Sequence, residues 1–280
     1  MNIAIVGFGR IGKLITRKLI NNKKIYVTCV LDKQNNKQNI SYLLNYDSVY
    51  GSLAKKSKID GENLIVGKKK IKILKSFDEV NFISITKKLD VIIDSSGDFT
   101  NVSKAKKLIN KNPKLKYIFT NTNKFVEKEI IFGVNEHNLS KKDQMISTSI
   151  CDSNAICHPL KWLMENPGII SGSVTTLHPW LSSQRLVDGM GISTKNTNVT
   201  WTDFSSGRSS INNLITKKTS AIKTVEKILP KLNGRITDIS VRVPTNIVTC
   251  ADMTLRLKKT NIKQVIDVLK KNALKSKVIK

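Results

Sequence analysis

The chain has 280 residues, of which 40% are hydrophobic and 25% are charged, which is typical of a soluble globular protein with room for two domains. No apolar stretch reaches the length of a membrane span, and the N-terminus lacks the features of a signal peptide, so we expect a cytoplasmic location without membrane attachment. The four cysteines lie far apart and form no C-x-x-C pair, so neither a metal site nor a disulfide framework is predicted.

The chain is strongly basic. It has 48 Lys and Arg against 21 Asp and Glu, a net charge of +27. A nucleic-acid-binding surface is one interpretation of such a charge. The lysines are spread along the whole chain, however, and the few aromatic residues do not alternate with them as a stacking platform for single strands requires. A nucleic acid partner therefore rests on the general positive charge alone.

A glycine-rich turn follows the first predicted strand. Residues 3–6 are apolar, and Gly7-Phe8-Gly9-Arg10-Ile11-Gly12 comes directly after them. In a strand–turn–helix unit Gly7 makes the tight turn, Gly9 lets the backbone approach a pyrophosphate, and Gly12 lets the helix pack on the strand. The N–H groups and the positive dipole end of the helix then face the phosphates. In this context the motif predicts a dinucleotide site.

An acidic residue ends the second predicted strand. Asp32 follows the β-branched run at residues 25–31 and lies about twenty residues beyond the last glycine of the turn. A carboxylate at this position accepts hydrogen bonds from the adenosine ribose hydroxyls. The sequence therefore predicts NAD as the cofactor, rather than its 2′-phosphorylated form.

The first half of the chain alternates strands and helices. Residues 64–66 and 71–74 predict a hairpin around Gly67-Lys68. Further predicted elements are the strands 89–94, 116–120, 130–133 and 145–148, and the helix 102–110. Continuous apolar strands of this kind are typical of a parallel sheet buried on both faces. We expect an α/β fold with a Rossmann-type, doubly wound domain over residues 1–150.

The second half has a different pattern. It predicts helices over 154–165 and 212–229, and alternating strands at 174–177, 238–243 and 250–257. Such strands suit an antiparallel sheet with one covered face. The segment Gly189–Gly207 is polar and irregular, and we expect a functional or interface loop there. Residues 151–280 are therefore predicted to form an α+β catalytic domain with a mostly antiparallel sheet.

A cysteine and a histidine are the candidate catalytic pair. Cys151 comes directly after a predicted strand and opens a helix. A helix N-terminus favours the thiolate, which is the nucleophilic form of cysteine. His178 ends the strand predicted at 174–177. The spacing alone leaves open whether the two side chains meet, and an isolated cysteine is more often a small buried hydrophobe.

Eight segments run in order through nearly the whole sequence. They are the glycine motif, Asn45-Tyr46-Asp47-Ser48-Val49-Tyr50-Gly51, Ser96-Gly97-Asp98-Phe99-Thr100, Phe132-Gly133-Val134-Asn135, Cys151-Asp152-Ser153-Asn154, Thr175-Thr176-Leu177-His178, Leu229-Pro230-Lys231-Leu232-Asn233-Gly234 and Arg242-Val243-Pro244-Thr245. With these segments the chain resembles the phosphorylating, type I glyceraldehyde-3-phosphate dehydrogenase family, which includes erythrose-4-phosphate dehydrogenase.

The resemblance implies a role for particular residues. Cys151 would attack an aldehyde while His178 takes the proton, and phosphate would open the resulting thioester to an acyl phosphate. The implied substrate and phosphate ligands are Thr219, Arg208, Arg242 and Asn154, and the implied cofactor residues are Gly7, Gly9, Arg10, Ile11, Gly12, Asp32, Ser96, Phe99 and Thr120. The implied partners are a sugar phosphate, inorganic phosphate and other copies of the chain, because family members form homo-oligomers.

The chain departs from the family pattern at several positions. Ile150 and Asp152 replace a serine and a threonine beside the nucleophile, Leu181 replaces a phosphate-binding threonine, and Ser206 stands for one arginine of a pair. Relative to the family we also expect the last sheet strand and the C-terminal helix to be missing. Three functions therefore stay open: an NAD-dependent aldehyde dehydrogenase, a degenerate nucleotide-binding or regulatory relative, and a basic nucleic-acid-associated protein.

Overall fold

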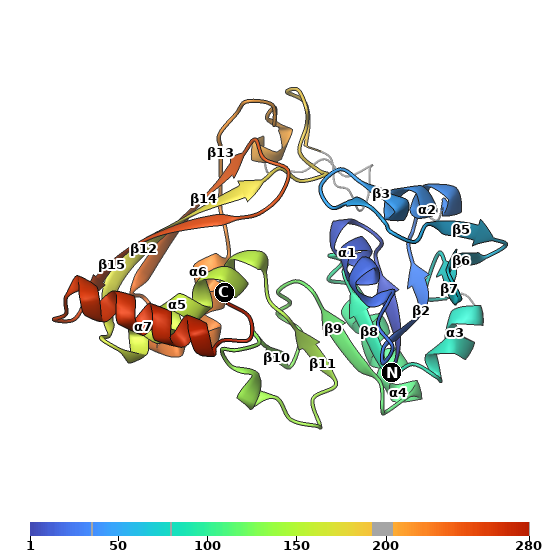
Figure 1. The fold of residues 1–280 in the computed structure, drawn as a ribbon, viewed down its shortest axis with the longest axis horizontal. Coiled ribbons are helices and arrows are strands. Elements are labelled where there is room, and N and C mark those ends of the chain that lie inside the picture. The colour runs from blue at the N-terminus through green and yellow to red at the C-terminus, as the bar shows by residue number, and fades with distance from the viewer. Residues whose placement is uncertain (35, 79, 192–203, 280) are drawn as a thin grey trace. The chain divides into compact units, whose positions relative to one another are not determined.

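The computed structural model describes residues 1–34, 36–78, 80–191 and 204–279 (Figure 1). The chain divides into two compact units. The first is Met1–Glu129 with Leu139–Thr148, and the second is Ile130–Asn138 with Ser149–Lys280. Within the described ranges, no helix combines the length and the apolar character needed to cross a bilayer.

The first unit is built on a nine-stranded sheet. Its strands are β1 (Asn2–Val6), β2 (Tyr26–Leu31), β5 (Ser57–Asp60), β6 (Asn63–Val66), β7 (Lys69–Leu74), β8 (Val91–Asp94), β9 (Lys116–Phe119), β10 (Lys128–Glu129) and β11 (Met145–Ser147). They lie in the order β10-β11-β9-β8-β1-β2-β7-β6-β5, and only the pairs β5/β6 and β6/β7 are antiparallel. The chain crosses from one half of the sheet to the other beside β1, which is where open α/β sheets bind their ligands.

Helices flank this sheet. They are α1 (Arg10–Leu19), α2 (Lys37–Asn45), α3 (Val80–Thr86) and α4 (Asn101–Lys111), and a small ribbon of β3 (Tyr46–Asp47) and β4 (Gly51–Ser52) follows α2. The central strand β1 contributes to two separate cores, with Ala4 and Val6 in one and Ile3 and Ile5 in the other. Successive side chains of a strand point to opposite faces, so both faces of the sheet are covered. The predicted doubly wound α/β architecture is thereby confirmed.

Two local predictions for this half have different outcomes. The predicted hairpin is present, because β6 pairs with β7 in antiparallel register around Gly67. The strand predicted over 130–133 is wrong, since the strand here is β10, which ends at Glu129. The apolar residues Ile131 and Val134 instead pack in the core of the second unit, against α5 (Cys151–Glu165). The apolar residues of this segment are equally compatible with a strand and with a connection that packs against a helix, so the sequence pattern did not separate the two.

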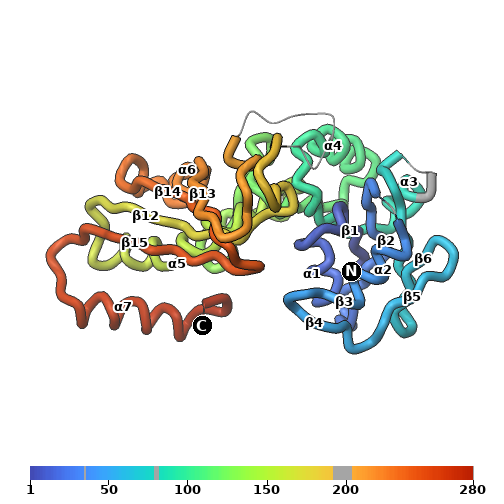
Figure 2. Tube along the Cα trace, turned by 90° about the horizontal axis from the view of Figure 1, so that it is seen from above, coloured from blue at the N-terminus to red at the C-terminus, as the bar shows by residue number. Residues whose placement is uncertain are grey.

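The second unit has a four-stranded mixed sheet covered by helices (Figure 2). Its strands are β12 (Ile169–Pro179), β13 (Ile215–Lys217), β14 (Ile236–Val243) and β15 (Cys250–Leu257), and its other helices are α6 (Ala221–Ile228) and α7 (Ile262–Lys275). The order is β13-β14-β12-β15, with β12 and β14 parallel and the outer pairs antiparallel. Residues of α5, α6 and α7 pack with those of β12 and β15 in one core.

The helix predicted over 212–229 is only half correct. Residues 215–217 form β13 and pair with β14, from Ile215 opposite Arg242 to Lys217 opposite Ser240. The helix begins only at Ala221, whose backbone N–H donates to the Thr219 hydroxyl, and it ends before Pro230 as predicted. Short 3₁₀ helices occur at Glu136–Asn138, Phe204–Gly207 and Pro230–Leu232. Of the expected loop Gly189–Gly207, residues 192–203 lie outside the described part of the chain.

Candidate functional site

The glycine turn of the first unit has the geometry that a dinucleotide needs. Gly7 has a φ of +81°, and a Cβ on this residue would lie 2.6 Å from the backbone of Ser96. A Cβ on Gly12 would lie 2.0 Å from the carbonyl oxygen of Gly7. Gly9 is different, because it has an ordinary φ and a Cβ there would meet nothing within 4 Å. Two glycines are therefore required by packing, and the third leaves open space over the first turn of α1.

Asp32 lies at the edge of this turn. One of its carboxylate oxygens accepts a hydrogen bond from the Phe8 backbone N–H at 2.8 Å, and the other accepts from the Gln34 N–H at 3.0 Å. The half-buried carboxylate is thus held in place, with the remaining acceptor positions of its oxygens available. A carboxylate at the end of this strand can accept hydrogen bonds from ribose hydroxyls, so the residues fit an adenine dinucleotide.

The other predicted cofactor residues follow the carboxyl ends of β8 and β9. Ser96 donates to Asp94 at 2.6 Å, and Thr120 donates to the Asp94 carbonyl at 3.2 Å. The side chain of Phe99 is 49% exposed. Lys33 pairs with Asp98 at 3.1 Å, and the pKa of Asp98 falls to about 2, because hydrogen bonds from Thr100 and Lys33 outweigh the effect of burial.

Arg10 and Ile11 occupy the start of α1 directly after the glycine turn, and Ile11 is 47% exposed. Their backbone N–H groups belong to the first turn of the helix, whose dipole favours an anion. The predicted cofactor residues of the first unit thus lie on the glycine turn, at the start of α1 and after the ends of β2, β8 and β9.

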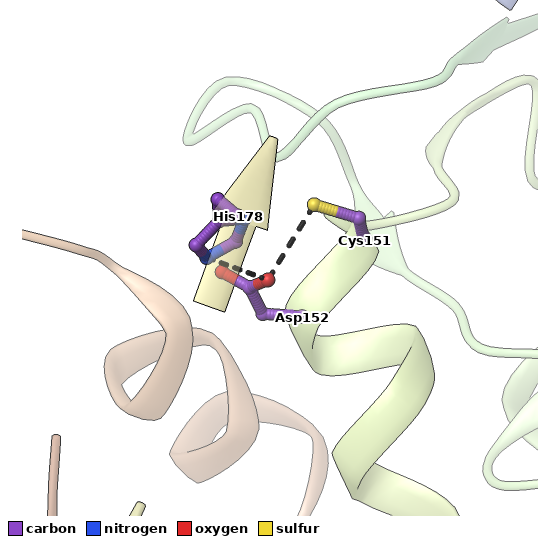
Figure 3. A group of neighbouring side chains, drawn as sticks. All are labelled: Cys151, Asp152 and His178. Carbon is purple, nitrogen blue, oxygen red and sulfur yellow. Dashed lines mark hydrogen bonds and ion pairs between the residues drawn. The ribbon is translucent and has the colours of Figure 1, made fainter. Parts of the chain in front are cut away.

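The candidate nucleophile of the second unit lies at the first position of α5 (Figure 3). The Cys151 thiol donates to a carboxylate oxygen of Asp152 at 3.5 Å. His178 Nε2 lies 3.1 Å from the same oxygen, and the ligating atoms of the three residues all lie within 4.8 Å of one another. Cys151 is exposed, whereas Asp152 and His178 are buried. The structure therefore brings the predicted cysteine and histidine together, with a carboxylate in contact with both.

The environment of the thiol opposes its ionisation. Protein atoms around the sulfur partly desolvate it and raise the pKa of Cys151, although the residue is classed as exposed. The charge of Asp152 and its hydrogen bond raise the pKa further. The Asp152 backbone N–H and the nearby charge of Arg242 lower the pKa but do not compensate. A carboxylate stabilises the neutral thiol because a second negative charge beside it is unfavourable. These surroundings favour the neutral thiol over the thiolate.

His178 and Arg242 are neighbours on adjacent strands. His178 near the end of β12 is directly opposite Arg242 of β14, and Nε2 of His178 also lies 3.1 Å from the Thr176 hydroxyl. Arg242 donates to the Pro179 carbonyl at 2.9 Å. The half-buried guanidinium is thus held by the carbonyl of the residue that follows His178.

The remaining predicted phosphate ligands are more dispersed. Asn154 is exposed and donates to the Ile150 carbonyl at 2.9 Å. Arg208 is exposed and pairs with Asp188 at 2.8 Å, and Thr219 is half-buried at the start of α6. Leu181, which stands at a predicted phosphate position, is 39% exposed.

Lys217 is a further positive charge in this unit that the sequence did not single out as a phosphate ligand. Lys217 Nζ donates to the Ser206 hydroxyl at 3.3 Å, so a lysine contacts the serine that we expect at the position of a family arginine. Lys217 lies on β13, next to the strand that carries Arg242. The sequence signal for it was weak, because lysine is abundant throughout the chain and this segment was expected to be helical.

Comparison with known proteins agrees with this description. The family model for the glyceraldehyde 3-phosphate dehydrogenase NAD binding domain matches residues 1–102, and the model for the C-terminal domain matches residues 150–279. The chain is 33% identical over 278 residues to the glyceraldehyde-3-phosphate dehydrogenase of Buchnera aphidicola subsp. Schizaphis graminum, covering 99% of this chain and 80% of that protein. It is 32% identical over 272 residues to glyceraldehyde-3-phosphate dehydrogenase B of Aspergillus oryzae, covering 97% and 78%.

Both halves of the chain therefore match the same family. The segment that matches the NAD binding domain contains the glycine turn and the first strands of the sheet. The fold of the first unit, the steric requirement for two of its glycines and the cysteine at the start of α5 agree with that match. The chain belongs to the glyceraldehyde-3-phosphate dehydrogenase family and is an NAD-dependent dehydrogenase.

Proposed function

We propose that this protein oxidises an aldehyde sugar phosphate, glyceraldehyde 3-phosphate, to an acyl phosphate through a covalent intermediate on Cys151. The observation that carries the proposal is the cluster of thiol, carboxylate and imidazole at the start of α5. It occurs in a chain with the two domains of the dehydrogenase family. A thiol nucleophile, a proton acceptor and a hydride acceptor are the groups that this oxidation needs.

Cys151 is the nucleophile in this proposal. Its sulfur attacks the aldehyde carbon, and its single proton passes to His178 through the carboxylate of Asp152, one oxygen of which contacts both groups. The backbone N–H at the start of α5 stabilises the oxyanion that forms. NAD, when bound, supplies the hydride acceptor. Loss of a hydride from the carbon of the first adduct leaves a thioester on Cys151. Inorganic phosphate then displaces the sulfur, and Cys151 returns as the leaving group.

The substrate phosphate is held by positive charge in the second unit. Arg242 lies beside His178 across the sheet, and Lys217 lies on the neighbouring strand. Thr219 and Arg208 add a hydroxyl and a second guanidinium. A charge-assisted hydrogen bond contributes about 1.5–3 kcal/mol, so Lys217 offsets part of what Ser206 and Leu181 remove. Erythrose 4-phosphate carries the same aldehyde and phosphate groups and is the alternative substrate.

A second function is favoured by the residue beside the nucleophile. Asp152 raises the pKa of Cys151, and Ile150 places no hydroxyl at the start of α5, where the family has a serine. The charge of Asp152 disfavours a reactive thiolate. The missing hydroxyl at Ile150 disfavours a second phosphate site. The alternative is a protein that binds NAD and has weak or no dehydrogenase activity.

The test is reduced-nicotinamide formation from NAD, glyceraldehyde 3-phosphate and inorganic phosphate. We expect Cys151→Ser to abolish turnover and to leave NAD affinity nearly unchanged, whereas Cys250→Ser, which changes the other exposed cysteine, keeps turnover. Turnover that persists in Cys151→Ser would refute the assignment of the nucleophile. A folded wild-type protein that binds NAD without turnover would support the alternative.

A further inference from the structure

Three metal-ligating atoms of different chemistry meet in the second unit. They are the Cys151 sulfur, a carboxylate oxygen of Asp152 and an imidazole nitrogen of His178, all within 4.8 Å of one another (Figure 3). We propose that these three side chains form a binding site for a zinc ion, with a fourth position open to water or another small ligand.

Two of the three distances between the ligand atoms are close to those of tetrahedral coordination, and the third is within 4.8 Å. A zinc ion with bonds of about 2.3 Å to sulfur and about 2.0–2.2 Å to nitrogen and oxygen places sulfur and oxygen about 3.6 Å apart, and nitrogen and oxygen about 3.4 Å apart. The structure has 3.5 Å between Cys151 Sγ and Asp152 Oδ1, and 3.1 Å between His178 Nε2 and the same oxygen. Two edges of the coordination polyhedron are therefore nearly formed before a metal binds.

The ligands are also held in place by the fold. Asp152 and His178 are 3% and 4% exposed, and they belong to α5 and β12, which pack in the same core. Cys151 is exposed, so a metal ion has access from solvent. On binding, His178 Nε2 exchanges its contact with the Thr176 hydroxyl, now 3.1 Å long, for a bond to the metal. Little ordering of side chains is then needed.

The ligand types select the metal. Thiolate and imidazole favour zinc, whereas magnesium and calcium prefer sites made of oxygen atoms. The charge of Arg242, which acts on Cys151, opposes any cation at this position. Asp152 supplies the compensating negative charge, and the thiol adds another when its proton leaves to solvent as the sulfur–zinc bond forms. Asp152, which departs from the family pattern, is thus the residue that makes this a three-ligand site.

Zinc binding has a consequence for activity that rests on the proposed function. A sulfur bound to zinc cannot attack an aldehyde, so zinc would inhibit the enzyme reversibly and a chelator would restore turnover. Metal binding itself does not depend on the proposed reaction. Its test therefore uses neither NAD nor substrate, and failure of one proposal leaves the other standing.

The experiment uses Co²⁺ as a spectroscopic substitute for zinc in the full-length, reduced, metal-free protein. We expect a thiolate-to-cobalt charge-transfer band, together with the intense visible bands of a tetrahedral site, and we expect Zn²⁺ to abolish both. Cys151→Ser should remove the charge-transfer band, and Asp152→Asn and His178→Asn should each weaken affinity by more than about tenfold. Cys250→Ser is the matched control and should leave the spectrum unchanged.

A second measurement avoids variants that do not fold. In the wild-type protein Zn²⁺ should protect Cys151, but not Cys250, from alkylation by iodoacetamide, as mapped by peptide mass spectrometry, and a chelator should reverse the protection. Absence of a charge-transfer band, a band that survives in Cys151→Ser, or equal protection of both cysteines would overturn the proposal.

Discussion

A carboxylate oxygen of Asp152 contacts both His178 Nε2, at 3.1 Å, and the Cys151 thiol, at 3.5 Å. The histidine predicted to take the proton of the cysteine therefore shares one acceptor with it. This acceptor raises the pKa of the thiol and adds a negative charge at the start of α5. Thiol chemistry in this protein consequently depends on Asp152 as well as on the predicted pair.

We expect Asp152→Asn to make Cys151 more reactive at neutral pH. The pKa of the thiol lies above its ordinary value of 9.0, and part of this increase comes from the Asp152 charge and hydrogen bond. Removing the charge lowers the pKa, and the rate of alkylation of Cys151 at pH 7 should rise by about tenfold or more.

The measurement is the rate of iodoacetamide modification of Cys151 against pH. In the wild type the rate should still be rising above pH 9, because a raised pKa delays thiolate formation, whereas the midpoint in Asp152→Asn should be lower. Asp267→Asn, on the exposed surface of α7, is the control and should behave as the wild type. An unchanged midpoint in Asp152→Asn would contradict the electrostatic argument.

Substitutions of two glycines in the turn should affect different properties of the protein, one its stability and the other its NAD affinity. A Cβ on Gly12 lies 2.0 Å from the Gly7 carbonyl oxygen, so Gly12→Ala should destabilise the protein by about 1–3 kcal/mol. A Cβ on Gly9 meets open space, so Gly9→Ala should fold normally and lose NAD affinity, because the methyl group occupies the pyrophosphate path. Urea unfolding and NAD titration separate the two outcomes. Tight NAD binding by Gly9→Ala would place the pyrophosphate elsewhere.

Asp32→Asn should reduce NAD affinity by about ten- to a hundredfold, because hydrogen bonds to a charged group contribute about 1.5–3 kcal/mol. The asparagine keeps one oxygen acceptor near the Phe8 N–H, so the turn should remain folded. Binding is measured by fluorescence titration or calorimetry, with Asp60→Asn in the exposed β5–β6 turn as control. Equal NAD affinity in both variants would exclude a ribose contact at Asp32.

Lys217→Met should raise the KM for the phosphorylated aldehyde by about tenfold and change kcat less, since the lost charge acts on substrate binding. Lys218→Met, one residue further and exposed, is the matched control. The KM for unphosphorylated glyceraldehyde should be the same in both variants, because that aldehyde has no phosphate group. A KM that increases equally for both aldehydes would indicate a disturbed fold rather than a lost phosphate contact.

Much of the first unit, and the start of α5 in the second, was predictable from sequence because the signals are local. The apolar run before Gly7 and the spacing to Gly12 specify a strand, a turn and a helix within a few residues. The β6–β7 hairpin follows from two short apolar runs around Gly67, and α5 from the residues that follow the strand β11. The cofactor and the position of Cys151 at a helix start are consequences of these local patterns.

Other features depended on partners distant in the chain. Residues 130–133 read as a strand, yet Ile131 packs against α5 in the second unit. Residues 215–217 read as the start of a helix, yet they pair with β14. In both cases contacts with a part of the chain distant in sequence outweigh the secondary structure that the segment favours locally. Tertiary contacts commonly override propensity in this way.

The sequence by itself determined the glycine turn, the alternation of strands and helices that predicts a doubly wound sheet, and Cys151 as the candidate nucleophile. Each of these rests on patterns within short segments of the chain. Only the tertiary structure decided that Asp152 contacts both Cys151 and His178, and that Lys217 contacts Ser206. These contacts require β12 and β13 to be brought to α5 and to the 3₁₀ turn at Phe204–Gly207. That placement follows from the burial of apolar faces across the whole unit, which no single segment specifies.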